Sequence, residues 1–158
     1  MFRPMRRYKQ QVSDEACREI LRREPRGVLS LLGDEGYPYG VPLDFWYDEA
    51  HHAICFHGAK EGHKLDAMRR MDKASFCIWE QGFRKEGAWE LNITRVIAFG
   101  RITVVEDPVR TEEIARQIGL KYHPTVESVE YELANALSRV LCWELRVEHM
   151  TGKLVNEK

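Results

Sequence analysis

In the segment Phe56–Lys64, a predicted strand ends in two small residues, and a helix is predicted to follow over about residues 60–70. Three cationic or titratable side chains fall near the first turn of that helix: Lys60, His63 and Lys64. A helix N-terminus already carries about +0.5 of a unit charge, so cations placed there indicate a compensating anion. Unpaired backbone N–H groups, Gly62 for close approach and Lys64 as a point charge would form a phosphate cradle. A solvated charged face, partly neutralised by Glu61, is the alternative that the sequence leaves open.

His57 lies at the predicted strand end beside this cradle. We expect it near the reacting end of a ligand, as a polar contact or a proton source, and a histidine with satisfied hydrogen bonds at a strand end is the alternative. The neighbours His51 and His52 cannot share one metal ion with good geometry, and no carboxylate stands at a recognisable ligand spacing. We therefore expect no metal site.

The stretch Tyr39–Tyr47 alternates strictly between two faces and is predicted as one strand. Pro42 has no backbone N–H to donate to a neighbouring strand, so the strand lies at a sheet edge or is bulged there. Protection of that edge is one explanation of the proline. The other is that the backbone at Pro42 faces a ligand.

The remaining elements that must position these residues follow from periodicity and end signals. A helix is predicted from the Ser13 cap to Pro25, another from Asp107-Pro108 to about Gly119, and a third over about Thr125–Ser138. The other predicted strands are Gly27–Leu32, Ala53–His57, Ala74–Glu80, Arg95–Glu106 with a bulge or bend at Gly100, and Leu141–Glu148. Six strands with peripheral helices predict a closed or partly open antiparallel barrel. The long connection Gly82–Thr94 suggests a binding or lid role.

Length and composition limit the class of protein. The 158 residues predict a single domain over residues 1–158, with a basic arm at residues 1–12. Lys and Arg number 24 against 25 Asp and Glu, and this balance argues against a nucleic-acid-binding domain. No apolar run reaches the roughly 18 residues that span a bilayer, so no membrane partner is expected. The four cysteines form no close pair, and without a signal sequence we expect them reduced in a cytoplasmic protein.

In order and spacing, these motifs together resemble the pyridoxamine-phosphate-oxidase-like, FMN-binding split-barrel superfamily, and within it the nitroimidazole-resistance (Nim-like) proteins. The resemblance covers most of the chain. It is carried by Tyr39–Leu43, Phe56–Ala59 with Gly62 and Lys64-Leu65, Val96–Arg101, and Leu141–Glu148 followed by Thr151–Lys153.

The resemblance implies a mainly β (α+β) fold, a six-stranded antiparallel split β-barrel with peripheral helices. It implies a homodimer with two flavins at the subunit interface, and Trp46, Trp89 and Trp143 are candidates for that interface. The cofactor would be FMN, and FAD would present a phosphate to the same cradle.

The implied flavin site has three parts. The isoalloxazine would lie along Val41, Pro42 and Leu43 and along His57, Gly58 and Ala59, and the phosphate on Gly62, His63 and Lys64. The partner subunit would cover the flavin with its Trp89–Arg95 region, including Thr94 and Arg95. Such proteins often carry Arg or Lys where this chain has His63, and an imidazole with a pKa of about 6.5 is only partly charged at neutral pH.

The activity implied is flavin-dependent reduction of a small nitroaromatic, such as a 5-nitroimidazole, or of a similar flat acceptor, with NAD(P)H or another donor supplying the electrons. In such a protein the flavin carries the redox chemistry, and the chain supplies orientation and water exclusion. His57 would be the catalytic side chain. The alternative is a flavin- or haem-binding module of the same fold without its own turnover.

Overall fold

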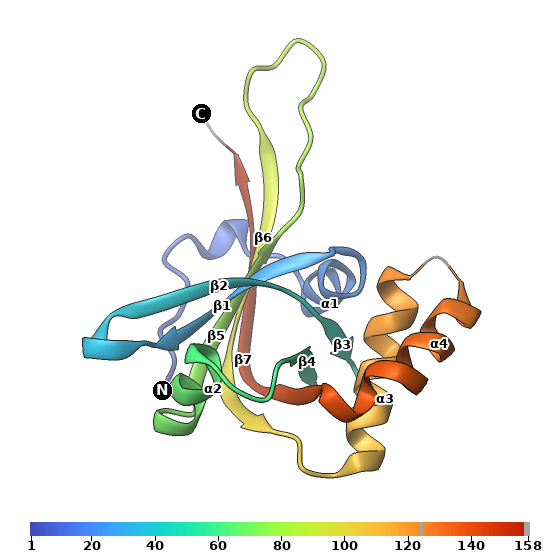
Figure 1. Cartoon of the computed structure of the whole chain (residues 1–158). Coiled ribbons are helices and arrows are strands. Elements are labelled where there is room, and N and C mark those ends of the chain that lie inside the picture. Colours follow the sequence, from blue (N-terminus) through green and yellow to red (C-terminus); the bar gives the residue numbers. More distant parts are fainter. Residues whose placement is uncertain (124, 157–158) are drawn as a thin grey trace.

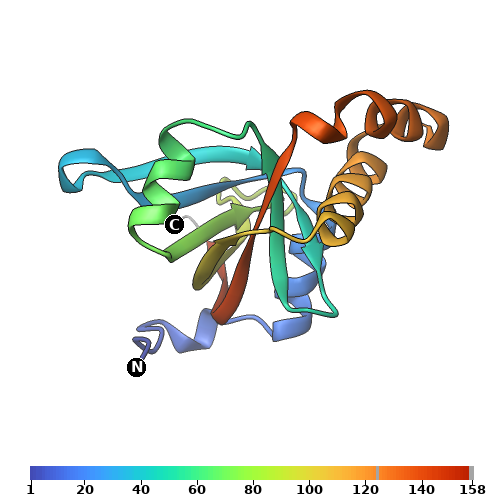
Figure 2. The same ribbon diagram turned by 60° about the horizontal axis from the view of Figure 1, so that its bottom comes forward.

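The computed structural model describes residues 1–123 and 125–156, and its strands form one seven-stranded antiparallel sheet in the order β2-β1-β5-β6-β7-β4-β3. The strands are β1 (Arg26–Leu32), β2 (Pro38–Asp44), β3 (Trp46–Asp48), β4 (Ala53–Gly58), β5 (Lys73–Trp79), β6 (Asn92–Val104) and β7 (Leu141–Asn156). The two edge strands, β2 and β3, follow each other directly in the chain, so the sheet curls and the chain itself joins its two edges (Figures 1 and 2). This is a split barrel, and the predicted fold class is confirmed.

The prediction of one continuous strand over Tyr39–Tyr47 is wrong, because the strand breaks at Phe45 into β2 and β3. At the break, the backbone of Phe45 bonds to side chains instead of to a strand. Its N–H donates to Tyr122 Oη at 3.0 Å, and its carbonyl accepts from Lys121 Nζ at 3.1 Å. The barrel therefore has seven strands where six were expected, and a helix end holds its corner.

In the described residues, four α-helices lie around the barrel: α1 (Asp14–Arg23), α2 (His63–Arg70), α3 (Pro108–Tyr122) and α4 (Val126–Ala136). Short 3-10 turns cover Tyr8–Gln10, Asp34–Gly36 and Leu137–Arg139. The predicted caps are confirmed, since Ser13 Oγ accepts from the Ala16 N–H at 3.2 Å and the Asp107 carboxylate accepts from the Val109 N–H at 3.0 Å. Helix α3 packs on the outside of β3, β4 and β7, and α4 packs on α3 (Figure 2).

The alternation along β4 divides the apolar residues into two cores. Ile54 and Phe56 face the barrel interior, where large side chains such as Phe45, Phe76 and Trp143 are buried. Ala53 and Cys55 face the other way and pack with Cys142 against α3.

All four cysteines are free thiols, and burial raises the pKa of Cys142 to about 12. Trp143 is only 1% exposed, so its assignment to a subunit interface is wrong.

Two glycines mark places where backbones approach closely. The predicted irregularity at Gly100 is confirmed by a register shift between Phe99 and Gly100, where a Cβ would collide with the Arg146 carbonyl. Gly119 does not end its helix as predicted, because α3 continues to Tyr122. A Cβ at Gly119 would lie 2.8 Å from Val129 Cγ1, so this glycine serves the contact between α3 and α4.

Two segments extend beyond the barrel. The connection between β5 and β6, residues 80–91, projects away from the sheet, and Trp89 on it is 67% exposed (Figure 1). The N-terminal arm joins β7 through the Val12 N–H, which donates to the Gly152 carbonyl at 3.0 Å. None of the helices in the described parts of the chain has the length and apolar character to cross a bilayer.

Candidate functional site

The start of α2 differs from the sequence prediction by one turn. The helix begins at His63, with Gly62 as its N-cap at φ 122° and ψ 171°. Lys60 lies before the helix and donates from Nζ to the Ser138 carbonyl at 2.6 Å, so its assignment to the first helical turn is wrong. The N–H groups of Leu65 and Asp66 both reach the Gly62 carbonyl. The N–H groups of His63 and Lys64 precede the first intrahelical acceptor and are directed out of the helix end.

The side chains of His63 and Lys64, at the start of α2, make different contacts. The His63 ring stacks on Tyr39, with ring centroids 4.1 Å apart, and its Nε2 lies 3.6 Å from Asp34 Oδ2. Asp34 also accepts from Arg70 at 3.0 Å, so His63 is held against the β1–β2 turn. Lys64 is half-buried, and within residues 1–123 and 125–156 its amine makes no ion pair. Lys64 is therefore the cation best placed to meet a ligand here.

These residues fit a phosphate group. Nothing lies within 4 Å of where a Cβ of Gly62 would stand, so the space in front of the helix end is open. Two outward N–H groups and the Lys64 amine supply donors, and the helix dipole favours an anion at this position. His63 would contribute through its backbone N–H, with its ring held by Tyr39 and Asp34.

Strand β2 connects this helix end to a second group of polar side chains. Val41, Pro42 and Leu43 lie opposite Leu29, Val28 and Gly27 of β1. Strand β2 is an edge of the sheet, which confirms the prediction made from Pro42. Tyr39 at one end of β2 contacts His63, and Asp44 lies at the other end, about 17 Å away at the usual rise per residue.

His57 lies on β4 at that far end. Asp44 ends β2, opposite Arg26 of β1, and lies close to His57 near the end of β4. Both side chains line a cavity of about 300 Å³ whose other walls include Ile118 and Tyr122 of α3 and Leu133 of α4. Desolvation lowers the pKa of His57, and the nearby Asp44 carboxylate only partly opposes this shift. The imidazole is therefore neutral at pH 7 and can both donate and accept a hydrogen bond.

The structure brings most, but not all, of the predicted residues together. Val41–Leu43 lie along one strand between the helix end at Gly62–Lys64 and the strand end at His57–Ala59. Thr94 and Arg95 lie on β6, which β1 and β5 separate from β2. They are therefore not neighbours of β2 within the sheet, and their contact with a flavin stays a prediction that requires a partner subunit.

The sequence analysis did not predict the α3–α4 wall of the cavity. It also did not predict the charge cluster around Arg110, described below, that fixes α3 to the sheet. Asp44 and the α3–α4 pair carry no motif, and the sequence placed Asp44 inside a continuous strand instead of at a strand end. Within the described chain, no three side chains among His, Cys, Asp and Glu gather as metal ligands.

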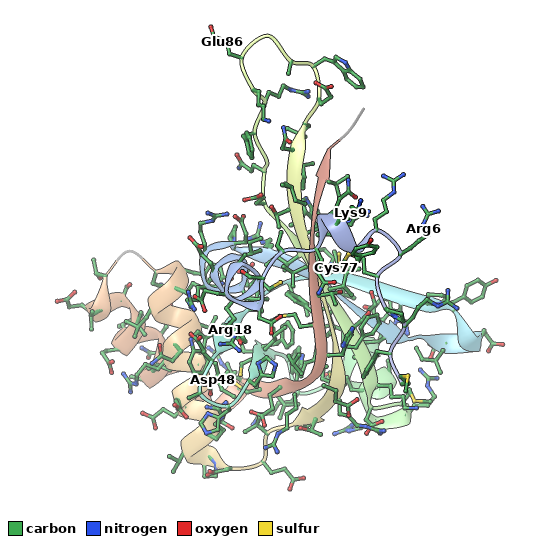
Figure 3. All side chains as sticks on the ribbon, turned by 180° about the vertical axis from the view of Figure 1, so that it is seen from behind. Arg6, Lys9, Arg18, Asp48, Cys77 and Glu86 are labelled. Carbon is green, nitrogen blue, oxygen red and sulfur yellow. The ribbon has the colours of Figure 1, made fainter. Side chains whose placement is uncertain are left out.

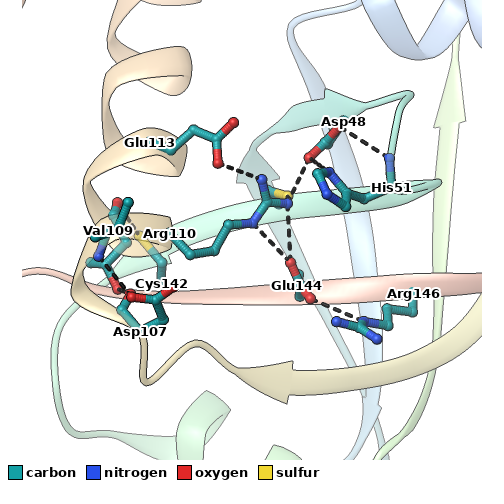
Figure 4. Close-up of polar contacts among 11 residues, drawn as sticks. Asp48, His51, Asp107, Val109, Arg110, Glu113, Cys142, Glu144 and Arg146 are labelled. Carbon is teal, nitrogen blue, oxygen red and sulfur yellow. Dashed lines mark hydrogen bonds and ion pairs between the residues drawn. The ribbon is translucent and has the colours of Figure 1, made fainter.

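A buried charge cluster fastens α3 to the sheet (Figure 4). Arg110 on α3 contacts Asp48 at 2.7 Å, Glu144 at 3.1 Å and Glu113 at 2.9 Å. Burial raises the pKa of Asp48, but hydrogen bonds from Arg110 and His51 outweigh it and the net shift is downward. This cluster holds the N-terminal half of the helix whose C-terminal half lines the cavity.

A match to a known protein family identifies the family of this chain. A family model described as pyridoxamine 5'-phosphate oxidase matches residues 13–154, nearly the whole chain. The chain belongs to this family. A search of the curated proteins gave no significant match.

Solved structures support the same fold. A candidate 5-nitroimidazole antibiotic resistance protein from Bacteroides thetaiotaomicron superposes with a TM-score of 0.74 at 18% identity, over 94% of this chain and 90% of that one. The flavocytochrome Anf3 from Azotobacter vinelandii gives 0.76 at 17% identity, over 96% of this chain and 72% of that one. An FAD-binding protein from Mycobacterium smegmatis gives 0.69 at 15% identity, over 94% and 99%. At 15–18% identity these superpositions establish the fold of this chain.

Proposed function

We propose that this protein binds a flavin and reduces a small flat aromatic acceptor, with nitroaromatics such as 5-nitroimidazoles as the leading class. The cavity shared by His57 and Asp44 carries the proposal, because it opens at the end of β2 and is walled by apolar side chains of α3 and α4. A volume of about 300 Å³ is at the small end of ligand pockets. Flavin binding by structural neighbours and the resistance protein among them support the same activity.

In this proposal the phosphate of FMN, or of FAD, is held by Lys64 and the N–H groups at the start of α2. The ring system lies along Val41–Leu43 toward His57–Ala59, where backbone groups meet its polar edge. When bound, the flavin would supply two-electron transfer from NAD(P)H or another donor to the acceptor. The chain orients the acceptor, excludes water through the α3–α4 wall, and holds a proton at a ring nitrogen of His57.

We also propose a homodimer with the flavin at the interface. The segment of residues 80–91 supports this, since it projects beyond its own barrel (Figure 1) and carries Trp89, which is 67% exposed. Sedimentation that finds only monomer at micromolar concentration would contradict the dimer.

The absorbance spectrum of the purified protein, followed by mass analysis of the released cofactor, tests the first step. A flavin spectrum that NAD(P)H bleaches and a 5-nitroimidazole restores is the expected result. A flavin band that no donor bleaches, or a haem Soret band, would instead indicate a binding module, an outcome suggested by the similarity to a flavocytochrome.

The role of His57 has its own test. His57→Ala should lower turnover at least about 100-fold while flavin stays bound, the usual range for loss of a proton donor. His123→Ala is the matched control, because His123 lines the same cavity without lying at the end of β4. Full turnover in the flavin-loaded His57→Ala variant would remove His57 from the mechanism.

A further inference from the structure

A second group of cations gathers away from the flavin site, where the N-terminal arm crosses β6 and β7. The arm is held at both ends: Phe2 stacks on His149 with centroids 4.6 Å apart, and Gln11 forms a bridge with Lys153. Figure 3 shows the arm, with Arg6 and Lys9 labelled, along the back of the molecule. Between these anchors lies a hollow of about 270 Å³ lined by Arg3, Arg6, Arg7, Arg95, Lys153 and Thr151, together with Met5 and Ile97.

The charges in this hollow are unbalanced. Arg95 and Lys153 lie directly opposite each other on neighbouring strands, an arrangement that destabilises a sheet when both residues carry the same charge. Desolvation and the nearby Arg95, Arg7 and Arg6 lower the pKa of Lys153. Within residues 1–123 and 125–156, no carboxylate lines the hollow. Docking of the arm therefore concentrates positive charge where an anion would relieve the repulsion.

An exposed aromatic ring stands beside the cations. Trp79 is the direct partner of Arg95 on the other side of β6, so the two side chains share a face of the sheet. Trp79 is 51% exposed. A flat exposed indole next to a cationic hollow suits a ligand that joins a heterocyclic base to phosphate groups.

We propose that this hollow is a binding site for the phosphates of a nucleoside diphosphate or a similar nucleotide, with Trp79 as the platform for its base. The arm arginines and Lys153 bind the phosphates, and the Thr151 hydroxyl provides a further donor. The site is distinct from the start of α2, which lies beside the β1–β2 turn. It shares Arg95 with the residues predicted to reach the partner's flavin, and it does not depend on the proposed flavin chemistry.

A small ligand fits the charge distribution better than a nucleic acid. The five cations are confined to one hollow of about 270 Å³, and the whole chain has a formal net charge of −1. A polymer of phosphates would require an extended basic stripe along its path. The hollow has room for a diphosphate and leaves the base outside, on the side of Trp79.

Calorimetric titration of the full-length protein with ADP and with inorganic pyrophosphate tests the proposal, in the flavin-loaded and the flavin-free state. Both probes should bind the wild type. The double variant Arg6→Gln/Arg7→Gln should lower the affinity for both probes about tenfold or more, as expected for lost charge-assisted hydrogen bonds. The single variant Lys153→Gln should have the same effect. Trp79→Ala should lower the affinity for ADP and leave the affinity for pyrophosphate unchanged.

Matched controls separate this site from general charge effects. Lys9→Gln removes an exposed cation of the same arm that does not line the hollow, and Tyr131→Ala removes an exposed aromatic ring on α4. Both should bind the two probes as the wild type does. The proposal would be overturned if Lys9→Gln lost as much affinity for the probes as the variants of the hollow do. It would also be overturned if neither probe bound at millimolar concentration, or if the protein bound single-stranded DNA more tightly than ADP. Loss of ADP binding on loading with flavin would also overturn it, because the hollow would then belong to the flavin.

Discussion

Replacing Arg110 with methionine should lower the free energy of unfolding by about 3 kcal/mol at pH 7, at the lower end of the range for breaking a buried ion pair. The side chains of Asp48 and Glu144 are 5% and 9% exposed, so water cannot replace the lost guanidinium. Each carboxylate keeps one other partner, His51 at 2.7 Å and Arg146 at 3.0 Å, which is why the lower end applies. Urea unfolding followed by fluorescence gives the difference from the midpoint and slope.

The pH dependence of this loss tests the electrostatic reasoning. In the wild type the lowered pKa of Asp48 contributes stability that is present above about pH 4 and is lost as the pH falls through that lowered pKa. In Arg110→Met the carboxylate of Asp48 loses its strongest donor and is protonated more readily. The gap in unfolding free energy between wild type and variant should therefore narrow as the pH falls from 7 toward 4.

Arg116→Met is the control for Arg110→Met, because Arg116 lies on the same helix and pairs at the surface with Glu112 and with Glu130 of α4. An exposed pair of this kind is worth less than about 1 kcal/mol. A loss in Arg110→Met no larger than in Arg116→Met, or a gap that stays constant between pH 7 and pH 4, would refute the argument that α3 is held by buried charge.

Three further predictions follow from the same geometry. Gly119→Ala places a Cβ 2.8 Å from Val129 Cγ1 and should cost about 1–3 kcal/mol, seen as a lower melting temperature; an unchanged melting temperature would show that α4 moves freely. Burial lowers the pKa of Lys121 to about 8, so the unfolded chain binds more protons between pH 8 and 10.5 and the wild type gains stability across that range. Lys121→Met should lack this gain in unfolding free energy, and parallel pH profiles of the two proteins would contradict it. Lys64→Gln should raise the flavin dissociation constant about 10-fold to 100-fold in a fluorescence titration, whereas Lys60→Gln, whose amine is engaged by the Ser138 carbonyl, should change it little. Equal effects of the two variants would show that the start of α2 is not the phosphate site.

The sequence alone determined the parts of this protein that depend on near neighbours in the chain. Alternation and caps located the strands and the helices, Pro42 indicated an edge strand, and Gly100 indicated a bulge. The family and the fold class followed from the order of these motifs and are confirmed. Local hydrogen bonding and side-chain periodicity are enough for such inferences, because each involves residues only a few positions apart.

Only the tertiary structure decided the break at Phe45, the cavity at His57 and the position of Arg110. Phe45 leaves the ladder because Lys121 and Tyr122, more than seventy residues later, bond to its backbone. The alternation of β4 turns His57 toward α3, and the close approach at Gly119 sets the wall opposite it. Contacts between segments so far apart are selected by packing and by the cost of leaving buried polar groups unpaired, and no local pattern records them.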